Sequence, residues 1–223
     1  MQLSRTAPGT ARNRILALCE CLVGGAFVIG HNVYHAVPNE VPLLVALLIL
    51  TLLLRWRPVS SVGLERPASW KLTLSIAVGA AALLQLKDFV TEPLGLYLWP
   101  QPQRVSAVIE STRHNFGAAM LSLLIVWTFA AFGEELGYRA LLLRRAADAL
   151  NGTRLGYAVA ILFSSVLFGF GHFYKGPAGV MDSTISGLIL AAAYLLSGRN
   201  MWAPIFAHGL GDTFAIVYTY FAG

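Results

Sequence analysis

Residues 116–132 contain no charged side chain, and two adjacent glutamates and an arginine follow within the next seven residues. About 20 apolar residues of α-helix cross the hydrocarbon core of a bilayer, so this run predicts a helix buried in a membrane. A charged group deep in such a helix costs about 2.5–3.5 kcal/mol or more, and it is kept where it pairs or reacts. The segment 131–139 therefore predicts a membrane helix whose carboxylates form ion pairs or take part in a reaction.

The composition extends this prediction to the whole chain. Hydrophobic residues make up 57% of the 223 residues and charged residues only 12%, whereas a soluble domain carries about 25% charged residues. Because lipid offers no partner to backbone polar groups, apolar spans fold as helices. We expect an all-α, polytopic transmembrane helical bundle of about seven spans. The apolar segments are 15–34, 41–54, 72–86, 116–150, 155–173, 179–196 and 202–221.

The basic residues are unevenly placed along this pattern. The net charge is +5, and twelve of the sixteen lysines and arginines fall on the side of the N-terminus when the seven segments alternate across the membrane. Cytoplasmic loops are enriched in lysine and arginine, so the bias predicts a cytoplasmic N-terminus. The basic residues do not form an aromatic-interleaved surface suited to nucleic acid, and we expect no nucleic-acid partner.

Spacing on the fourth apolar segment separates its charged residues into two kinds. Glu135 and Arg139 are four residues apart, so they share a helix face and are expected to form an ion pair. Glu134 lies about 100° around the helix and is not satisfied by that pair. A buried network that only locks helix packing is one interpretation. The second carboxylate favours chemistry, because one arginine needs only one partner.

Two further pairs occur at the same spacing on later apolar segments. Phe168 and His172 end the fifth segment, and His208 and Asp212 lie inside the seventh. A histidine at a helix end is often an interface residue, but histidine is also the usual proton-transfer group near neutral pH. If three helices turn Glu134 and these polar residues into one cavity, the carboxylate can take a proton from water and another donor can stabilise an oxyanion.

In this order, the three pairs resemble the CPBP family of CAAX-processing and bacteriocin-processing intramembrane endopeptidases, also called the Abi family. The resemblance covers about residues 116–222. The motifs are EExxxR at Glu134, Glu135 and Arg139, FxxxH at Phe168 and His172, and HxxxD at His208 and Asp212. The resemblance implies a helical intramembrane protease of the glutamic type.

The resemblance also implies a role for each motif residue. Glu134 and His172 would activate a water molecule, and His208 with Asp212 would form the oxyanion site. No cofactor is expected in this account. An older view of the family treats such residues as zinc ligands, and Glu134, His172 and His208 are the residues that would bind zinc here.

The remaining motif residues support the site in the same account. Glu135 and Arg139 would position the first glutamate, and Phe168 would pack beside the site. Eukaryotic members of the family carry asparagine where Asp212 stands. An ionised aspartate cannot donate to an oxyanion, so Asp212 must be protonated or must instead orient and charge His208.

The sequence divides the chain into three parts. Residues 1–14 are expected to be a cytoplasmic N-terminal segment, residues 15–115 to hold N-terminal transmembrane helices and loops, and residues 116–223 to form the catalytic transmembrane core. The first apolar run is long for a signal peptide, whose apolar region has about 7–15 residues, so we expect it to stay uncleaved. The longest polar stretch is 92–115, which contains three prolines, and residues 103–113 within it could form a short interfacial helix.

Simple alternation of seven spans creates one geometric difficulty. It places His172 near the outer end of its helix and His208 near the inner part of its own. For both to reach Glu134, some helices must be short, tilted or broken, and Gly169 and Gly171 offer places for this.

The expected partners are the lipid bilayer and a membrane-bound, lipidated or tail-bearing protein or peptide substrate. The expected location is the cell membrane, as a multi-pass protein of the bacterial inner-membrane type. Two other functions fit the buried polar residues. One is an ion- or proton-coupled membrane transporter, and the other is a catalytically inert immunity or scaffold member of the same family.

Overall fold

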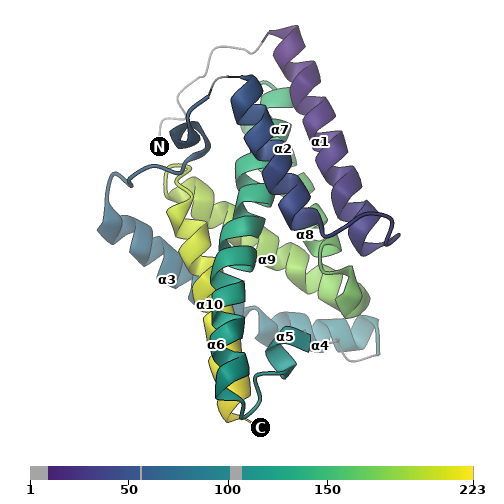
Figure 1. The fold of residues 1–223 in the computed structure, drawn as a ribbon, viewed down its shortest axis with the longest axis vertical. Coiled ribbons are helices and arrows are strands. Elements are labelled where there is room, and N and C mark those ends of the chain that lie inside the picture. Colours follow the sequence, from purple (N-terminus) through teal and green to yellow (C-terminus); the bar gives the residue numbers. More distant parts are fainter. Residues whose placement is uncertain (1–9, 56, 101–106, 223) are drawn as a thin grey trace.

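The structure, a computed structural model, describes residues 10–55, 57–100 and 107–222. Within these ranges every regular element is a helix (Figure 1), which confirms the predicted all-α class. Of the predicted segment 1–14, only residues from 10 onward are described. The elements are α1 (Ala11–Asn32), α2 (Glu40–Leu54), η1 (Val59–Val62), α3 (Trp70–Leu86), α4 (Asp88–Leu98), α5 (Ala107–Glu110), α6 (Phe116–Ile125), η2 (Val126–Glu134), η3 (Leu136–Leu143), α7 (Arg144–Ala149), α8 (Arg154–Phe170), η4 (Phe173–Lys175), α9 (Gly176–Leu196) and α10 (Trp202–Phe221).

Several helical segments suit a bilayer by their length and composition. Each of the seven predicted apolar segments forms a helix. Among the described residues, α2 and α8 are apolar but shorter, with 15 and 17 residues, and α10 has 20. Four segments are long and apolar enough to cross a membrane: Ala11–Asn32, Trp70–Leu98, Phe116–Ala149 and Phe173–Leu196. The chain is a multi-pass membrane protein.

The first residues of the polar stretch 92–115 are helical. Residues 92–98 belong to α4, which continues α3 and crosses to the far side of the molecule (Figure 1). Pro93 lies inside α4. Asp182 of α9 accepts hydrogen bonds from Lys87 Nζ and from Thr91 Oγ1, the latter at 2.6 Å. These bonds tie α4 to α9, and such tertiary contacts outweigh the low helix propensity of this polar, proline-containing stretch.

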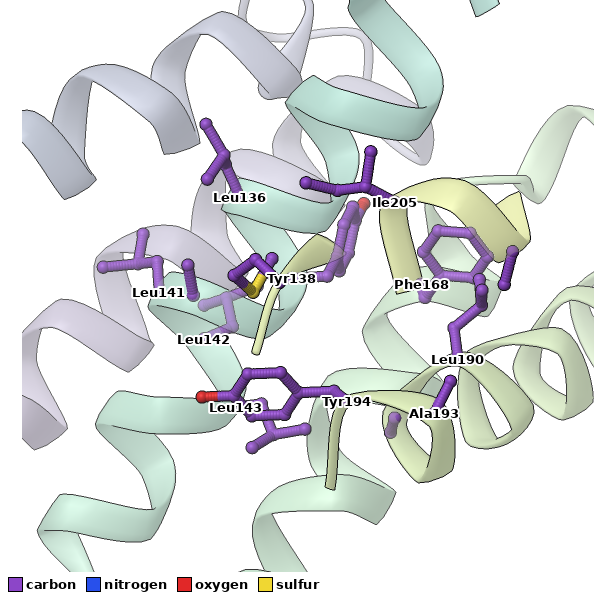
Figure 2. Close-up of a cluster of buried hydrophobic side chains, with 14 of the residues drawn as sticks. Leu136, Tyr138, Leu141, Leu142, Leu143, Phe168, Leu190, Ala193, Tyr194 and Ile205 are labelled. Carbon is purple, nitrogen blue, oxygen red and sulfur yellow. The ribbon is translucent and has the colours of Figure 1, made fainter. Parts of the chain in front are cut away.

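The long helix Phe116–Ala149 runs through the middle of the molecule, with α10 beside it and α1 and α2 against its upper half (Figure 1). Its central part, η2 and η3, has π-helical hydrogen bonding. Long π-helical stretches are rare, and shorter ones often mark functional sites. All eight residues of η3 are buried. Several of them form the core shown in Figure 2, against side chains from α8, α9 and α10.

Two glycines on the long helix let α2 approach closely. A β-carbon at Gly133 would lie 2.9 Å from Val41 Cγ1, and one at Gly137 would lie 2.9 Å from Leu44 Cδ1. Small residues spaced by four positions let membrane helices pack at short distance. The start of α2 is therefore held directly against the part of the long helix that carries the charged residues.

The shortness of α8 removes the geometric difficulty expected from simple alternation. Its 17 residues rise about 25 Å, which is less than the roughly 30 Å hydrocarbon core. Because α8 returns alongside α7 and η3, it ends level with the middle of the long helix. A β-carbon at Gly171 would lie only 2.5 Å from the Tyr138 hydroxyl. The turn that carries His172 therefore reaches the depth of the charged residues.

Candidate active site

The predicted ion pair between Glu135 and Arg139 is confirmed. Arg139 Nη1 donates to Glu135 Oε1 at 2.8 Å, and both side chains are at most 1% exposed. The same guanidinium donates through Nη2 to the backbone oxygen of Gly187 at 3.0 Å and lies 4.6 Å from the centre of the Phe168 ring. One arginine thus links the long helix, α8 and α9, which only a planar group with several donors can do.

His208 is held by the same carboxylate. Its Nδ1 lies 2.9 Å from Glu135 Oε1. A carboxylate accepts hydrogen bonds, so Nδ1 carries the hydrogen and Nε2 is left for another partner. Nε2 lies 3.6 Å from Asp212 Oδ2, which is within range of an ion pair but too long for a hydrogen bond. The expected closeness of His208 and Asp212 is found, and the contact with Glu135 adds to it.

His172 follows the end of α8 and is fixed by the backbone. Its Nδ1 lies 3.0 Å from the carbonyl oxygen of Phe168. Since a carbonyl oxygen only accepts, Nδ1 carries the hydrogen and a neutral His172 presents Nε2 as an acceptor. The Phe168 ring lies 4.9 Å from the His172 ring and 5.8 Å from the His208 ring. Phe168 therefore separates and orients the two histidines.

Glu134 differs from Glu135 in its surroundings. It has no hydrogen-bond partner among the described residues, and its Oε2 is buried. The charged groups that act on its carboxylate include His208, Asp212 and Glu40. No hydrogen bond joins Glu134 to His172 within the part of the chain that the structure describes. The predicted unpaired carboxylate is thus found beside the His208–Asp212 pair.

Two residues beside the site were not found from the sequence. Tyr138 is 1% exposed, and its ring meets the Phe168 ring edge to face at 5.1 Å. Its hydroxyl lies 3.4 Å from Glu40 Oε1, and Glu40 is 5% exposed. The glycine pair Gly133 and Gly137 was an available signal, because this spacing predicts a closely packed neighbouring helix. The spacing does not identify which helix packs on these glycines, so it could not point to Glu40.

Zinc binding would require the side chains of Glu134, His172 and His208 to converge on one ion. A catalytic zinc site takes three protein ligands at about 2.0–2.2 Å from the metal for nitrogen and oxygen donors. Within the described ranges, no group of three or more His, Cys, Asp and Glu side chains is arranged to hold a metal ion.

Comparison with known families supports the motif assignment. Residues 116–214 match the family model described as type II CAAX prenyl endopeptidase Rce1-like, and all seven motif residues fall in this range. Neither the curated proteins nor the solved structures give a significant match to the chain. This match supports the resemblance of residues 116–214 to the CAAX protease (CPBP) family.

Proposed function

We propose that this protein is an endopeptidase that hydrolyses a peptide bond of a membrane-associated protein or peptide with water activated by a glutamate. One observation carries the proposal. A buried carboxylate without a partner, Glu134, lies beside His208, which is held by another carboxylate, and a second histidine, His172, packs on the same Phe168 ring as His208 and has its Nε2 free of the backbone bond. A site with an unsatisfied base and fixed imidazoles suits proton transfer.

The first step removes a proton from water. The water molecule lies between Glu134 and Nε2 of His172, which is the unprotonated nitrogen because Nδ1 donates to a backbone oxygen. One of these two groups accepts the proton, and the hydroxide oxygen bonds to the carbonyl carbon of the substrate. The carbonyl π bond breaks and its electron pair becomes the oxyanion.

His208, supported by Asp212, stabilises that oxyanion. With Nδ1 bound to Glu135, Nε2 of His208 carries a hydrogen only when the imidazole is protonated. Glu135 and Asp212 are the two carboxylates beside this cation, so they favour it. In this role Asp212 need not donate a hydrogen bond, and its difference from asparagine is accommodated. The tetrahedral intermediate then expels the amine, which takes the proton from the first pair as the C–N bond breaks.

The test uses purified protein in lipid vesicles with a panel of membrane-anchored peptides that vary in their C-terminal sequence, and products are identified by mass spectrometry. Glu134→Gln and His172→Ala are expected to lower the rate by about 10²–10⁴-fold, because each removes a proton-transfer group. Glu110→Gln changes an exposed carboxylate of α5 and serves as the matched control. Cleavage by Glu134→Gln at the wild-type rate would contradict the mechanism.

A chelator arm distinguishes the glutamic-type reaction from the metal alternative. We expect cleavage to be unchanged after prolonged incubation with a zinc chelator. Loss of cleavage that returns when zinc alone is added would instead favour the metal-dependent account of the family.

A further inference from the structure

A buried carboxylate lies beside the site but outside the region that matches the family. Glu40 is the first residue of α2 and is only 5% exposed. An unpaired ionised group at such a position is costly, so its partners indicate what it does. His31 from α1 and Tyr138 from the long helix lie against it, and Glu134 is next to Gly133, on which Val41 of α2 packs.

The fold delivers Glu40 to this position by close helix packing. Val41 and Leu44 fill the spaces above Gly133 and Gly137, where any larger residue would push α2 away. These two glycines flank Glu134 and Tyr138 in the sequence. The contact therefore places the first turn of α2 against the turn of the long helix that carries the proposed base.

Three side chains form a series of contacts from the end of α1 to the side of the site. His31 has 31% of its side chain exposed, and its Nε2 lies 3.6 Å from Glu40 Oε2. The Tyr138 hydroxyl donates to Glu40 Oε1 at 3.4 Å. The Tyr138 ring in turn packs on Phe168, whose carbonyl oxygen holds His172.

His31 has a defined role at the outer end of this path. Its Nδ1 lies 3.2 Å from the carbonyl oxygen of Val37, so Nδ1 carries the hydrogen. Nε2 can therefore face a carboxylate favourably only when the imidazole is protonated. A protonated His31 compensates the charge of Glu40, and a neutral one does not.

Glu40 and Glu134 adjoin the contact between Val41 and Gly133, so both carboxylates belong to the turns at which α2 meets the long helix. Each has one buried oxygen, Oε2, without a hydrogen-bond partner among the described residues. Like charges that share a poorly solvated region oppose each other's ionisation. A proton held by one of the pair therefore favours the ionised form of the other.

We propose that Glu40 is a positioning residue of the hydrolytic site, which holds Tyr138 against Phe168 and sets through its charge the pH at which Glu134 acts as a base. This inference rests on the proposed function, in which Glu134 activates water. It brings the N-terminal helices, for which sequence and family supply no role, into the reaction.

The test is the pH dependence of kcat/KM for a peptide that the wild type cleaves. Glu40→Gln keeps the shape and an acceptor for Tyr138 but removes the charge. The acid limb of its profile is expected to move to lower pH by roughly half a unit to one unit, since Glu134 then ionises without an opposing charge. His31→Asn removes the compensating charge and is expected to move the limb the other way.

Glu20→Gln is the matched control. It makes the same change in another carboxylate of the N-terminal half, which pairs with Arg55 at 2.8 Å. Its acid limb is expected to stay where the wild type has it. Tyr138→Phe is expected to lower kcat several-fold, with KM and the acid limb retained, because it loosens the wall of the site without changing charge.

The outcomes separate the two proposals. An inactive Glu134→Gln variant with an unshifted limb in both Glu40→Gln and His31→Asn would overturn the role of Glu40 and leave the proposed function intact. An active Glu134→Gln variant would overturn the proposed function itself. If Glu40→Gln does not fold, as judged by thermal unfolding in detergent, the His31→Asn profile decides, and an unshifted limb there counts against the proposal.

Discussion

At the scale of single residues, one carboxylate oxygen connects two parts of the site. Oε1 of Glu135 accepts from both Arg139 and His208, so the same atom joins the helix-packing network to the proposed oxyanion site. The first interaction was expected from spacing alone. The second was not, because the rule that residues four apart meet applies within one helix and says nothing about partners on another.

Arg139→Lys tests how much of this depends on the guanidinium. A lysine has one ammonium group, so it cannot hold Glu135, reach the Gly187 oxygen and stack on Phe168 together. We expect the free energy of unfolding to fall by about 1–3 kcal/mol, the range for a lost hydrogen bond to a charged group. Thermal unfolding in detergent measures it.

The control is Arg113→Lys, in a pair with Glu110 that is about half exposed. A change of about 0.5 kcal/mol or less is expected there, because exposed ion pairs contribute little. Equal effects at Arg139 and Arg113 would show that the buried guanidinium has no special importance.

Asp212→Asn tests the charge role assigned to that residue. If Asp212 stabilises a protonated His208, removal of its charge should lower kcat about tenfold, which corresponds to about 1.4 kcal/mol of transition-state stabilisation. Steady-state kinetics at constant pH provide the measurement. A variant with undiminished kcat would instead support hydrogen-bond donation at this position, as an asparagine provides.

At the scale of elements, α8 and α9 pack through small residues. A β-carbon at Gly169 would lie 2.1 Å from Thr184 Oγ1 and 2.6 Å from the backbone oxygen of Val180. Arg139 spans the same interface through the Gly187 oxygen. The separation of these two helices therefore fixes both Phe168 and the guanidinium that covers it.

Gly169→Ala should push the two helices apart. We expect a loss of about 1–3 kcal/mol in stability, typical of overpacking, together with reduced cleavage. Gly79→Ala in α3 is the matched control, because nothing lies within 4 Å of its β-carbon. That control should be neutral or more stable by up to about 1 kcal/mol, since alanine is the better helix former.

Hydropathy was a good guide to the elements and a poor guide to their limits. The segment 155–173 was expected, and the helix is Arg154–Phe170, with a turn that lets His172 face the site. The helix α4 was missed because its polar residues and Pro93 look like a loop until Asp182 is placed against them. The π-helical turns of η2 and η3 could not be predicted from the apolar pattern.

At the scale of the whole molecule, one end collects the basic residues. Arg14 Nε donates to the backbone oxygen of Ala149, which places the start of α1 and the end of α7 at the same end. Arg199 binds the Tyr157 hydroxyl near this end as well. If the N-terminus is cytoplasmic, as the basic residues predict, this end lies in the cytoplasm.

Cysteine labelling tests that orientation. In a variant without Cys19 and Cys21, single cysteines replace Ala36 and Ser60, which are exposed at opposite ends of α2. A membrane-impermeant maleimide should label Ala36→Cys in intact cells and Ser60→Cys only after permeabilisation. The reverse pattern would show that the positive-inside bias misleads for this protein.

The sequence predicted the C-terminal part of the site better than its surroundings. Paired spacing located Glu135 with Arg139 and His208 with Asp212, because both pairs lie on one helix. The contribution of Glu40 could not be predicted, since an apolar helix such as α2 does not show in its sequence which face meets which neighbour. Only the structure supplies this information, because it shows α2 packed on Gly133 and Gly137 of the long helix.

Finally, the contacts between the long helix and α10 include two hydrogen-bonded pairs, Trp127 with Thr213 and Glu135 with His208. The two pairs are eight residues apart on the long helix and five residues apart on α10. A single residue inserted or deleted between the two pairs would rotate the following part of the helix by about 100°. One of the two pairs would then lose its contact. The number of residues between Trp127 and Glu135 is therefore as constrained as their identity. Length variation among related chains should accumulate in the loops, and this stretch should evolve by substitution alone.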